Sequence, residues 1–270
     1  MPPIIAALLG IVEGITEYLP VSSTGHLILA GHFLGLADED AAVKSFEIVI
    51  QLGSLLAVVA HYRALLVERV RGLFARDEAA WRLLASIAVA FLPVAVLGLL
   101  LAKTIKAHLF APLPVAIALA TGGVLMIAVE RLRARRAAPA LDGLDHVTPR
   151  RALAVGLGQC LSLIPGTSRS MCTIVSGQLA GLSTGTAAEF SFLVALPTLG
   201  AATLYEGWKA RHVLGASVGG AGLAIGLVVS FFVAWGVIAT FLSYLRRRGL
   251  EPFGWYRIVF GALVLWSLSR

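Results

Sequence analysis

The chain has 270 residues, of which 58% are hydrophobic and only 14% are charged. This composition excludes an ordinary water-soluble domain, in which about a quarter of the residues are charged. The net charge of +7 would suggest a nucleic-acid partner if the protein were soluble. Here the arginines flank apolar segments, so we interpret them as topology signals and lipid-headgroup contacts, and we expect no nucleic-acid partner.

Apolar runs recur along the chain, and they are long enough to cross a hydrocarbon core of ~30 Å. In lipid only helices and closed barrels satisfy their backbone polar groups, and continuous rather than alternating apolar runs favour helices. The sequence therefore predicts an all-α polytopic membrane protein. Its six transmembrane helices are expected at about 44–61, 83–102, 113–130, 186–206, 217–242 and 253–269.

The first polar motif is E-G-I-T-E-Y-L-P-V-S-S-T-G-H at 13–26. Glu13 and Glu17 are four residues apart, so on a helix their side chains lie one turn apart on the same face. Two carboxylates this close in a low-dielectric medium cannot both stay ionised without a cation or a cationic side chain. They predict a site for a divalent cation, Mg²⁺ or Ca²⁺, or a proton-handling pair, because these ions prefer oxygen ligands. The alternative is a helix end that simply faces water.

Pro20 ends this helix, and three hydroxyl residues and a histidine follow it. His26 could act as general base or nucleophile, although a single histidine in apolar sequence is more often a hydrogen-bonded core residue. The nearby carboxylates and hydroxyls favour the functional interpretation. Ser22 or Ser23 could be the nucleophile or a hydrogen-bond donor to phosphate, and the sequence leaves both options open.

Arginine-rich loops set the predicted topology. The positive-inside rule places three of them in the cytoplasm, at 62–82, 131–151 and 246–248. The loops placed outside are 31–43, 103–112 and 207–216. Residues 152–183 must then enter and leave from the cytoplasm, and residues 1–30 can likewise enter and leave from outside. This predicts two re-entrant helix pairs.

The second polar motif is P-G-T-S-R-S-M-C-T at 165–173. Gly166 allows close approach of the backbone, and N–H groups at the start of the next helix favour an anion. Arg169 supplies a planar fork suited to phosphate oxygens, and Thr173 lies one turn beyond it. The alternative is an arginine with a purely structural role.

The two re-entrant segments resemble each other. Opposite entry sides together with this weak similarity indicate an inverted-topology repeat with a site at the repeat interface. We expect one integral membrane domain, 1–270, with repeats at about 1–130 and 152–270 and a cytoplasmic linker at 131–151. The matching positions are Gly10, Glu13, Pro20, Ser22 and Ser23 in the first segment, and Gly156, Gln159, Pro165, Thr167 and Ser168 in the second.

Three further polar residues interrupt apolar segments. Arg257 lies inside the last one, where it is expected to pair with a carboxylate or with a ligand phosphate. Gln51 and Glu189 could line a cavity or form hydrogen bonds between helices. Cys160 and Cys172 sit in apolar sequence and indicate neither a disulfide framework nor a metal site.

The two motifs, together with E-F-S-F-L at 189–193, resemble the signatures of the bacterial undecaprenyl-pyrophosphate phosphatases, the bacitracin-resistance family. The resemblance implies a phosphoric anhydride hydrolase in the bacterial cytoplasmic (inner) membrane. It would convert undecaprenyl pyrophosphate to undecaprenyl phosphate for peptidoglycan synthesis and would confer bacitracin resistance. The family also implies a divalent cation and two re-entrant helix pairs in an inverted repeat.

The resemblance also implies roles for individual residues. Met171 and Cys172 depart from the family pattern, which usually has small residues there; they could narrow the approach to Arg169 or fill lipid-facing space. The expected catalytic residues are Glu17, Ser22, Ser23, His26 and Arg169. The expected phosphate-binding residues are Gly166, Ser168, Arg169, Ser170, Thr173 and Arg257. The expected metal ligands are Glu13 and Glu17.

The alternative from another class is a polyprenyl-phosphate transporter or flippase, which would use the same inverted-repeat architecture without hydrolysis. In either case the partners are a polyprenyl pyrophosphate lipid and the membrane lipid itself. The topology predicts that the active site opens to the periplasmic or external side. The oligomeric state is left open, with a homodimer as one option.

Overall fold

The computed structural model describes residues 1–36, 40–109, 112–135, 140–245 and 247–268. Parts of the loops expected at 31–43, 103–112, 131–151 and 246–248 lie outside these described residues. Helices make up most of the described chain, and its extended pairing is limited to an isolated bridge between Leu141 and Leu182. The predicted all-α class is confirmed.

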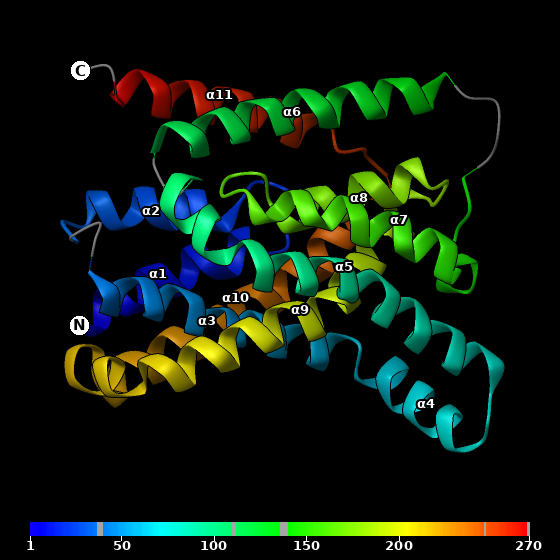
Figure 1. The fold of residues 1–270 in the computed structure, drawn as a ribbon, viewed down its shortest axis with the longest axis horizontal. Coiled ribbons are helices and arrows are strands. Elements are labelled where there is room, and N and C mark those ends of the chain that lie inside the picture. Colours follow the sequence, from blue (N-terminus) through cyan, green and yellow to red (C-terminus); the bar gives the residue numbers. More distant parts are fainter. Residues whose placement is uncertain (37–39, 110–111, 136–139, 246, 269–270) are drawn as a thin grey trace. The chain divides into compact units, whose positions relative to one another are not determined.

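Figure 1 shows the helices along the chain. In chain order they are α1 (Pro3–Thr16), α2 (Ser23–Phe33), α3 (Ala41–His61), α4 (Arg63–Phe74), α5 (Glu78–Leu109), α6 (Pro112–Ala134), the 3₁₀ turn η1 (Leu144–His146), α7 (Pro149–Gln159), the 3₁₀ turn η2 (Cys160–Leu163), α8 (Arg169–Leu179), α9 (Thr184–Val213), the π-helical turn η3 (Leu214–Val218), α10 (Gly219–Leu245) and α11 (Glu251–Leu268).

Long apolar helices confirm a multi-pass membrane protein. Within the described ranges, four helical stretches are long and apolar enough to cross a membrane: Ala41–His61, Glu78–Leu101, Leu113–Ala134 and Thr184–Leu245. The last stretch holds α9, η3 and α10, and so contains two of the predicted spans. The span predicted at 253–269 lies in α11, outside these four stretches. The count of six and the inverted repeat therefore stay predictions.

Several segments expected as loops are partly helical. Residues 62–82 contain α4 and the start of α5; α5 continues to Leu109, and α9 continues to Val213. The physical reason is that an apolar run marks the part of a helix that suits lipid, whereas the helix itself continues until a capping or breaking residue ends it. Such a breaker, Gly219 with φ 78°, follows η3.

The chain divides into two compact units, each of which takes segments from both predicted repeats. The prediction of a single domain built from two halves is not tested by this division. The first unit consists of Met1–Leu19, Ser23–Arg63 and Ala195–Phe241. The second unit consists of Pro20–Ser22, Ala64–Val194 and Leu242–Arg270.

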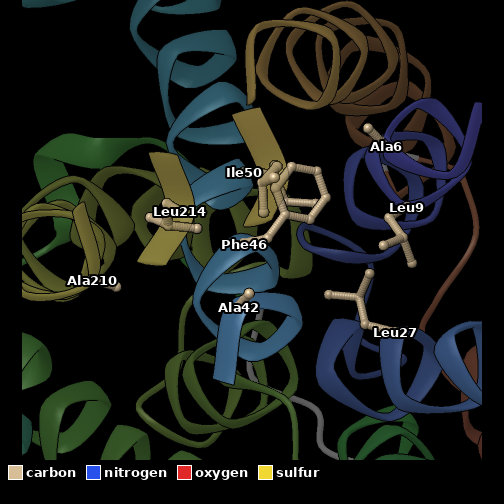
Figure 2. Close-up of a cluster of buried hydrophobic side chains, with 9 residues drawn as sticks. Ala6, Leu9, Leu27, Ala42, Phe46, Ile50, Ala210 and Leu214 are labelled. Carbon is tan, nitrogen blue, oxygen red and sulfur yellow. The ribbon is translucent and has the colours of Figure 1, made fainter. Parts of the chain in front are cut away.

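The core of the first unit joins α1, α2 and α3 to the region of η3. Figure 2 shows Leu9 and Leu27 beside the Phe46 and Ile50 side chains of α3. Helix α10 approaches α1 closely, since a Cβ on Gly14 would lie 2.8 Å from Cβ of Val233. Small residues permit such close helix packing in membranes. The buried cluster is Ala6, Leu9, Leu27, Ala42, Phe46, Ile50, Ala210, Leu214 and Val218.

The second unit is built mainly on two helix pairings, α6 with α11 and α5 with α7, while α8 packs on α7. Figure 1 shows α11 beside α6. Glycines on both helices bring their backbones together, because a Cβ on Gly123 of α6 would lie 2.5 Å from the carbonyl oxygen of Gly254 in α11. This close pairing places the first turn of α11 against the middle of α6.

Candidate active site

The carboxylates of the first motif lie one turn apart, as predicted. Glu17 caps α1 with helical dihedral angles, and its N–H donates to the Glu13 carbonyl at 3.0 Å. Both side chains are buried, with exposed fractions of 0% for Glu13 and 6% for Glu17. Burial makes two adjacent negative charges costly, so the pair favours a cation or a proton nearby.

Ser23 begins α2 and points its hydroxyl at this pair. Its Oγ donates to Oε2 of Glu17 at 2.7 Å, a short bond to a carboxylate. A carboxylate in this position polarises the hydroxyl, which suits either a nucleophile or a fixed hydrogen-bond donor. His26, half-buried, is three residues further along α2, so it lies on the same helical face as Ser23.

The turn before α2 depends on an unusual backbone conformation. Ser22 has φ 74°, a left-handed value that few residues other than glycine adopt. Its side chain is buried. Strained residues of this kind persist only where the surrounding structure imposes them, and they concentrate at functional sites.

The carboxylate oxygens of the first motif suit a hard cation whose coordination shell is completed by ligands from outside the protein. In the part of the chain that the structure describes, no three His, Cys, Asp or Glu side chains converge as a metal cage. Glu13 and Glu17 would then be the protein's contribution. Mg²⁺ is commonly held by one or two carboxylates together with water and substrate phosphates, so two buried carboxylates suffice.

The second motif forms a similar break. Helix α7 passes through η2 into a turn in which Gly166 has φ 94° and Ser168 has φ 73°. A Cβ on Gly166 would overlap the Val115 carbonyl of α6, so both the space and the dihedral angle require glycine here. The Ser168 Oγ accepts from the Met171 N–H at 3.3 Å and caps α8, and it lies 3.0 Å from the Ser170 Oγ.

Arg169 is the first residue of α8, and its orientation depends on a residue of α9. Its Nη1 donates to the Ser191 carbonyl at 3.1 Å. The hydroxyls of Ser191 and Thr173 lie 2.6 Å apart, and Thr173 also donates to the Arg169 carbonyl at 2.9 Å. The arginine is half-buried, so its cationic group is held at the helix N-terminus without being enclosed.

Sequence reasoning missed Ser191 as a member of this site. The available signal was its place in E-F-S-F-L, a polar residue inside an otherwise apolar run. Its partners could not be predicted because Ser191 lies 18 residues from Thr173 and on another helix.

Arg257 differs from Arg169, because it is fully buried with an exposed fraction of 0%. Its guanidinium donates to four backbone carbonyls and not to the carboxylate that the sequence offered as one alternative. The bonds are Nε to Leu119 at 3.2 Å, Nη1 to Pro20 at 3.1 Å, and Nη2 to Ala118 at 3.1 Å and to Gly166 at 2.9 Å.

The weaker candidates also have places in the structure. Glu189 lines a cavity of about 300 Å³ together with Asp142, Gly143, Gly185 and Thr186, which contains none of the predicted catalytic or phosphate-binding residues. Met171 and Cys172 are both buried, so neither faces lipid.

The structure thus groups the predicted site residues within the two units. The first unit holds the Glu17–Ser23 pair one turn from Glu13. The second unit holds the α8 N-terminus with its hydroxyls and Arg169, together with Arg257. That the acidic and the cationic groups share one cavity stays a prediction.

The comparison with protein families adds to this geometry. Residues 6–263 match the family described as bacitracin resistance protein BacA. The chain belongs to this family. Among relatives, it is 60% identical over 262 residues to the undecaprenyl-diphosphatase of Sorangium cellulosum, covering 97% of this chain and 85% of the relative.

Two further relatives of the bacitracin-resistance family match almost the whole chain. The undecaprenyl-diphosphatase 2 of Rhodospirillum rubrum is 48% identical over 265 residues, covering 97% of this chain and 94% of the relative. The undecaprenyl-diphosphatase of Nitrosomonas europaea is 50% identical over 261 residues, covering 96% and 92%. The family resemblance predicted from the two motifs is confirmed.

Proposed function

We propose that this chain hydrolyses undecaprenyl diphosphate to undecaprenyl phosphate and inorganic phosphate, and that it thereby returns the lipid carrier to peptidoglycan synthesis and confers bacitracin resistance. The observation that carries the proposal is the similarity, over 96–97% of this chain, to relatives named undecaprenyl-diphosphatase. The buried polar groups at both breaks supply side chains suited to that chemistry.

The second break would bind the phosphates. Arg169 offers a planar cationic fork, and the N–H groups at the start of α8 favour an anion. Ser168, Ser170 and Thr173 line the same turn. Gly166 keeps the turn compact, and these groups together would hold the diphosphate while charge develops in phosphoryl transfer.

The first break would activate the attacking group. The Glu17 carboxylate accepts a hydrogen bond from the Ser23 hydroxyl and can act as the base that takes its proton. His26 lies on the same face of α2 as Ser23 and can act as the general base or the nucleophile. Ser22 stays a second candidate nucleophile. Attack on the terminal phosphorus breaks the P–O–P bond and leaves the lipid monophosphate. If water attacks, the transferred phosphoryl group leaves directly as inorganic phosphate; if a side chain attacks, water must then cleave the phosphorylated side chain to release it.

Glu13 and Glu17 would hold the divalent cation, Mg²⁺ or Ca²⁺. When bound, such an ion neutralises the negative charge of the phosphate oxygens. The role of the chain is to present two buried carboxylates at one helix end, oriented by the helix and by the hydroxyl of Ser23.

The hydrolase is favoured over a polyprenyl-phosphate transporter, because the relatives described above carry the name of the phosphatase. The test is release of inorganic phosphate from undecaprenyl diphosphate by the purified protein in detergent. We expect release that stops when a chelator removes divalent cations. Transport in vesicles without any phosphate release would contradict the proposal.

We propose that the chain lies in the bacterial inner membrane, as the family resemblance implies, and the arginine-rich loops support a site that opens to the outside. A Ser23→Cys variant in oriented vesicles should react with a membrane-impermeant thiol reagent added outside. Cys160 and Cys172 are replaced by serine in the background, because both are free thiols. Labelling only from the cytoplasmic side would reverse the proposed orientation. Cross-linking in the same vesicles would test whether the protein forms a homodimer.

A further inference from the structure

We propose that Arg257 is a positioning residue that fixes the backbone of both active-site turns and does not bind the substrate phosphates. The inference rests on the proposed function and assigns this arginine a role different from the phosphate contact expected from sequence. It starts from the two carbonyls that its guanidinium holds outside α6, those of Pro20 and Gly166.

These two carbonyls occupy equivalent places in the two breaks, which shifts by one residue the match expected from sequence, where Pro20 was paired with Pro165 and Ser22 with Thr167. Pro20 precedes Ser22 by two residues, and Gly166 precedes Ser168 by two residues. Ser22 and Ser168 are the serines with left-handed φ values, 74° and 73°. The guanidinium of Arg257 therefore binds the equivalent carbonyl oxygen in each of the two turns. Each of these carbonyls belongs to the residue three positions before the start of the next helix, which begins at Ser23 or at Arg169.

The donors of Arg257 are almost fully used by these bonds. A guanidinium has five N–H groups, and four hydrogen bonds to carbonyls leave at most one for anything else. A phosphate held bidentately needs two parallel N–H donors. The side chain also has an exposed fraction of 0%, in contrast to the half-buried Arg169. Donor use and burial both exclude a bidentate phosphate contact.

Helix α6 contains a place made for this guanidinium. A Cβ on Gly122 would overlap Nη2 of Arg257 and would lie 3.0 Å from its Cζ. The carbonyls of Ala118 and Leu119, one turn earlier on α6, accept from the same group. Gly122 therefore provides the space and α6 provides two of the four acceptors, so the guanidinium position is set by the α6–α11 pairing.

Gly122→Ala tests the clamp without removing any functional group. The new methyl must displace the guanidinium, whereas its other close neighbour, Cε of Met171 at 3.0 Å, is the end of a flexible side chain that can move aside. We expect kcat for phosphate release to fall about 100-fold, the cost of a displacement of about 1 Å at an active site. We expect KM to change by less than about threefold, since no substrate contact is lost.

Two further variants sharpen this test. Arg257→Lys keeps the charge but has no planar fork to span four carbonyls, so we expect it to be as inactive as Arg257→Ala. The double variant Gly122→Ala, Arg257→Ala should be no less active than Arg257→Ala alone, because both changes break the same clamp. The matched control is Gly236→Ala in α10, where a Cβ would meet nothing within 4 Å, and it should retain normal activity.

A second measurement is independent of activity. Hydrogen exchange of backbone amides should become faster in both 18–22 and 164–168 in Gly122→Ala and in Arg257→Lys, with other helices protected as in the unaltered protein. The exchange measurement tests the role of Arg257 even if the purified protein releases no phosphate. Absence of phosphate release would contradict the proposed function but not the role of Arg257. If either Gly122→Ala or Arg257→Lys unfolds globally, the exchange measurement is made on the other variant.

Two results would overturn the clamp. The first is a rise in KM, and in the inhibition constant of inorganic pyrophosphate, with kcat unchanged in Gly122→Ala or Arg257→Lys; this would identify a phosphate contact. The second is faster exchange in only one turn, which would mean that the two breaks are not held by one residue.

Discussion

The α1–α2 segment and the α7–α8 segment use the same backbone device. Each begins with a proline in the first turn of its first helix, Pro3 in one and Pro149 in the other. Each turns through a serine with left-handed φ, and each continues into a helix of 11 residues. The shared turn fixes the orientation of the first residue of the following helix, which is Ser23 in α2 and Arg169 in α8.

The two segments differ in the charge that this device carries. The first has buried carboxylates, whereas the second has Gln159 in the place of Glu13, also fully buried, with its Nε2 donating to the Ala90 carbonyl at 3.4 Å. The first residue of the second helix is Ser23 in one segment and Arg169 in the other. The same turn conformation thus occurs in an acidic segment that suits a cation and in a cationic segment that suits phosphate.

The largest expected effects come from removing the charge that distinguishes each segment. Arg169→Ala and Glu17→Ala should each lower phosphate release about 100- to 1000-fold, the cost of losing one group that stabilises the transition state. Arg169→Lys is the matched control, which keeps the charge without the planar fork and should retain part of the activity. Near-normal release by either alanine variant would remove that segment from the proposed site.

Making the first segment resemble the second should have a smaller effect. Glu13→Gln supplies the residue found at position 159, and we expect activity to fall at least about tenfold, the usual cost of weakening a metal site. Excess Mg²⁺ should recover part of the loss, as measured by titrating the cation in the release assay. An unchanged cation dependence would contradict a role for Glu13 as a ligand. The mirror change Gln159→Glu should create no cation dependence of its own.

Substitution of Ser22 and Ser168 by glycine or by alanine tests whether the two turns have equivalent backbone strain. Alanine at Ser22 or Ser168 retains the strained left-handed conformation, whereas glycine adopts it freely. At each position we expect the glycine variant to be more stable than the alanine variant by about 1 kcal/mol. Thermal unfolding in detergent measures this difference. A difference at one serine only would show that the two turns are held in different ways.

The smallest expected effect lies outside both segments, where Arg131 of α6 donates to Glu251 of α11 at 2.6 Å. This bond, followed by one from Trp255, lowers the pKa of Glu251 below its ordinary value of 4.5. A lowered pKa stabilises the folded protein above the ordinary value, and the contribution is lost as pH falls through the lowered one.

Arg131→Ala should therefore raise the pKa of Glu251 toward 4.5 and leave stability at neutral pH nearly unchanged, because the pair is exposed to solvent. Unfolding temperatures measured from neutral to acidic pH check this. A large loss of stability or of activity at neutral pH would contradict the minor role given to this surface pair.

The sequence predicted the local features of both segments well. Each segment breaks near its expected proline, although α1 already ends at Thr16, before Pro20, and η2 ends at Leu163, before Pro165. Glu13 and Glu17 lie one turn apart because helical periodicity is a local property. The ends of helices were less predictable, since α4 forms in a segment expected as a loop. Polar sequence there indicated exposure to water, which does not prevent a helix.

The partners of the site residues could not be predicted from the sequence. Arg257 was expected to meet a carboxylate or a phosphate, whereas it donates to the Pro20 carbonyl 237 residues away. Ser191 became a neighbour of Arg169 because α9 folds beside α8. Neither contact leaves a pattern in one sequence, since backbone carbonyls are present at every residue and their accessibility depends on helix packing.

By itself the sequence determined the helical membrane class, the two breaks and the kinds of charge that each carries, because hydropathy, proline and the cost of burying charge act within a few residues. Only the tertiary structure decided that two serines adopt left-handed φ, that Ser23 donates to Glu17, and that one buried guanidinium holds both turns. These features depend on distances between helices, which are set when glycine-lined faces such as those of α6 and α11 pack together.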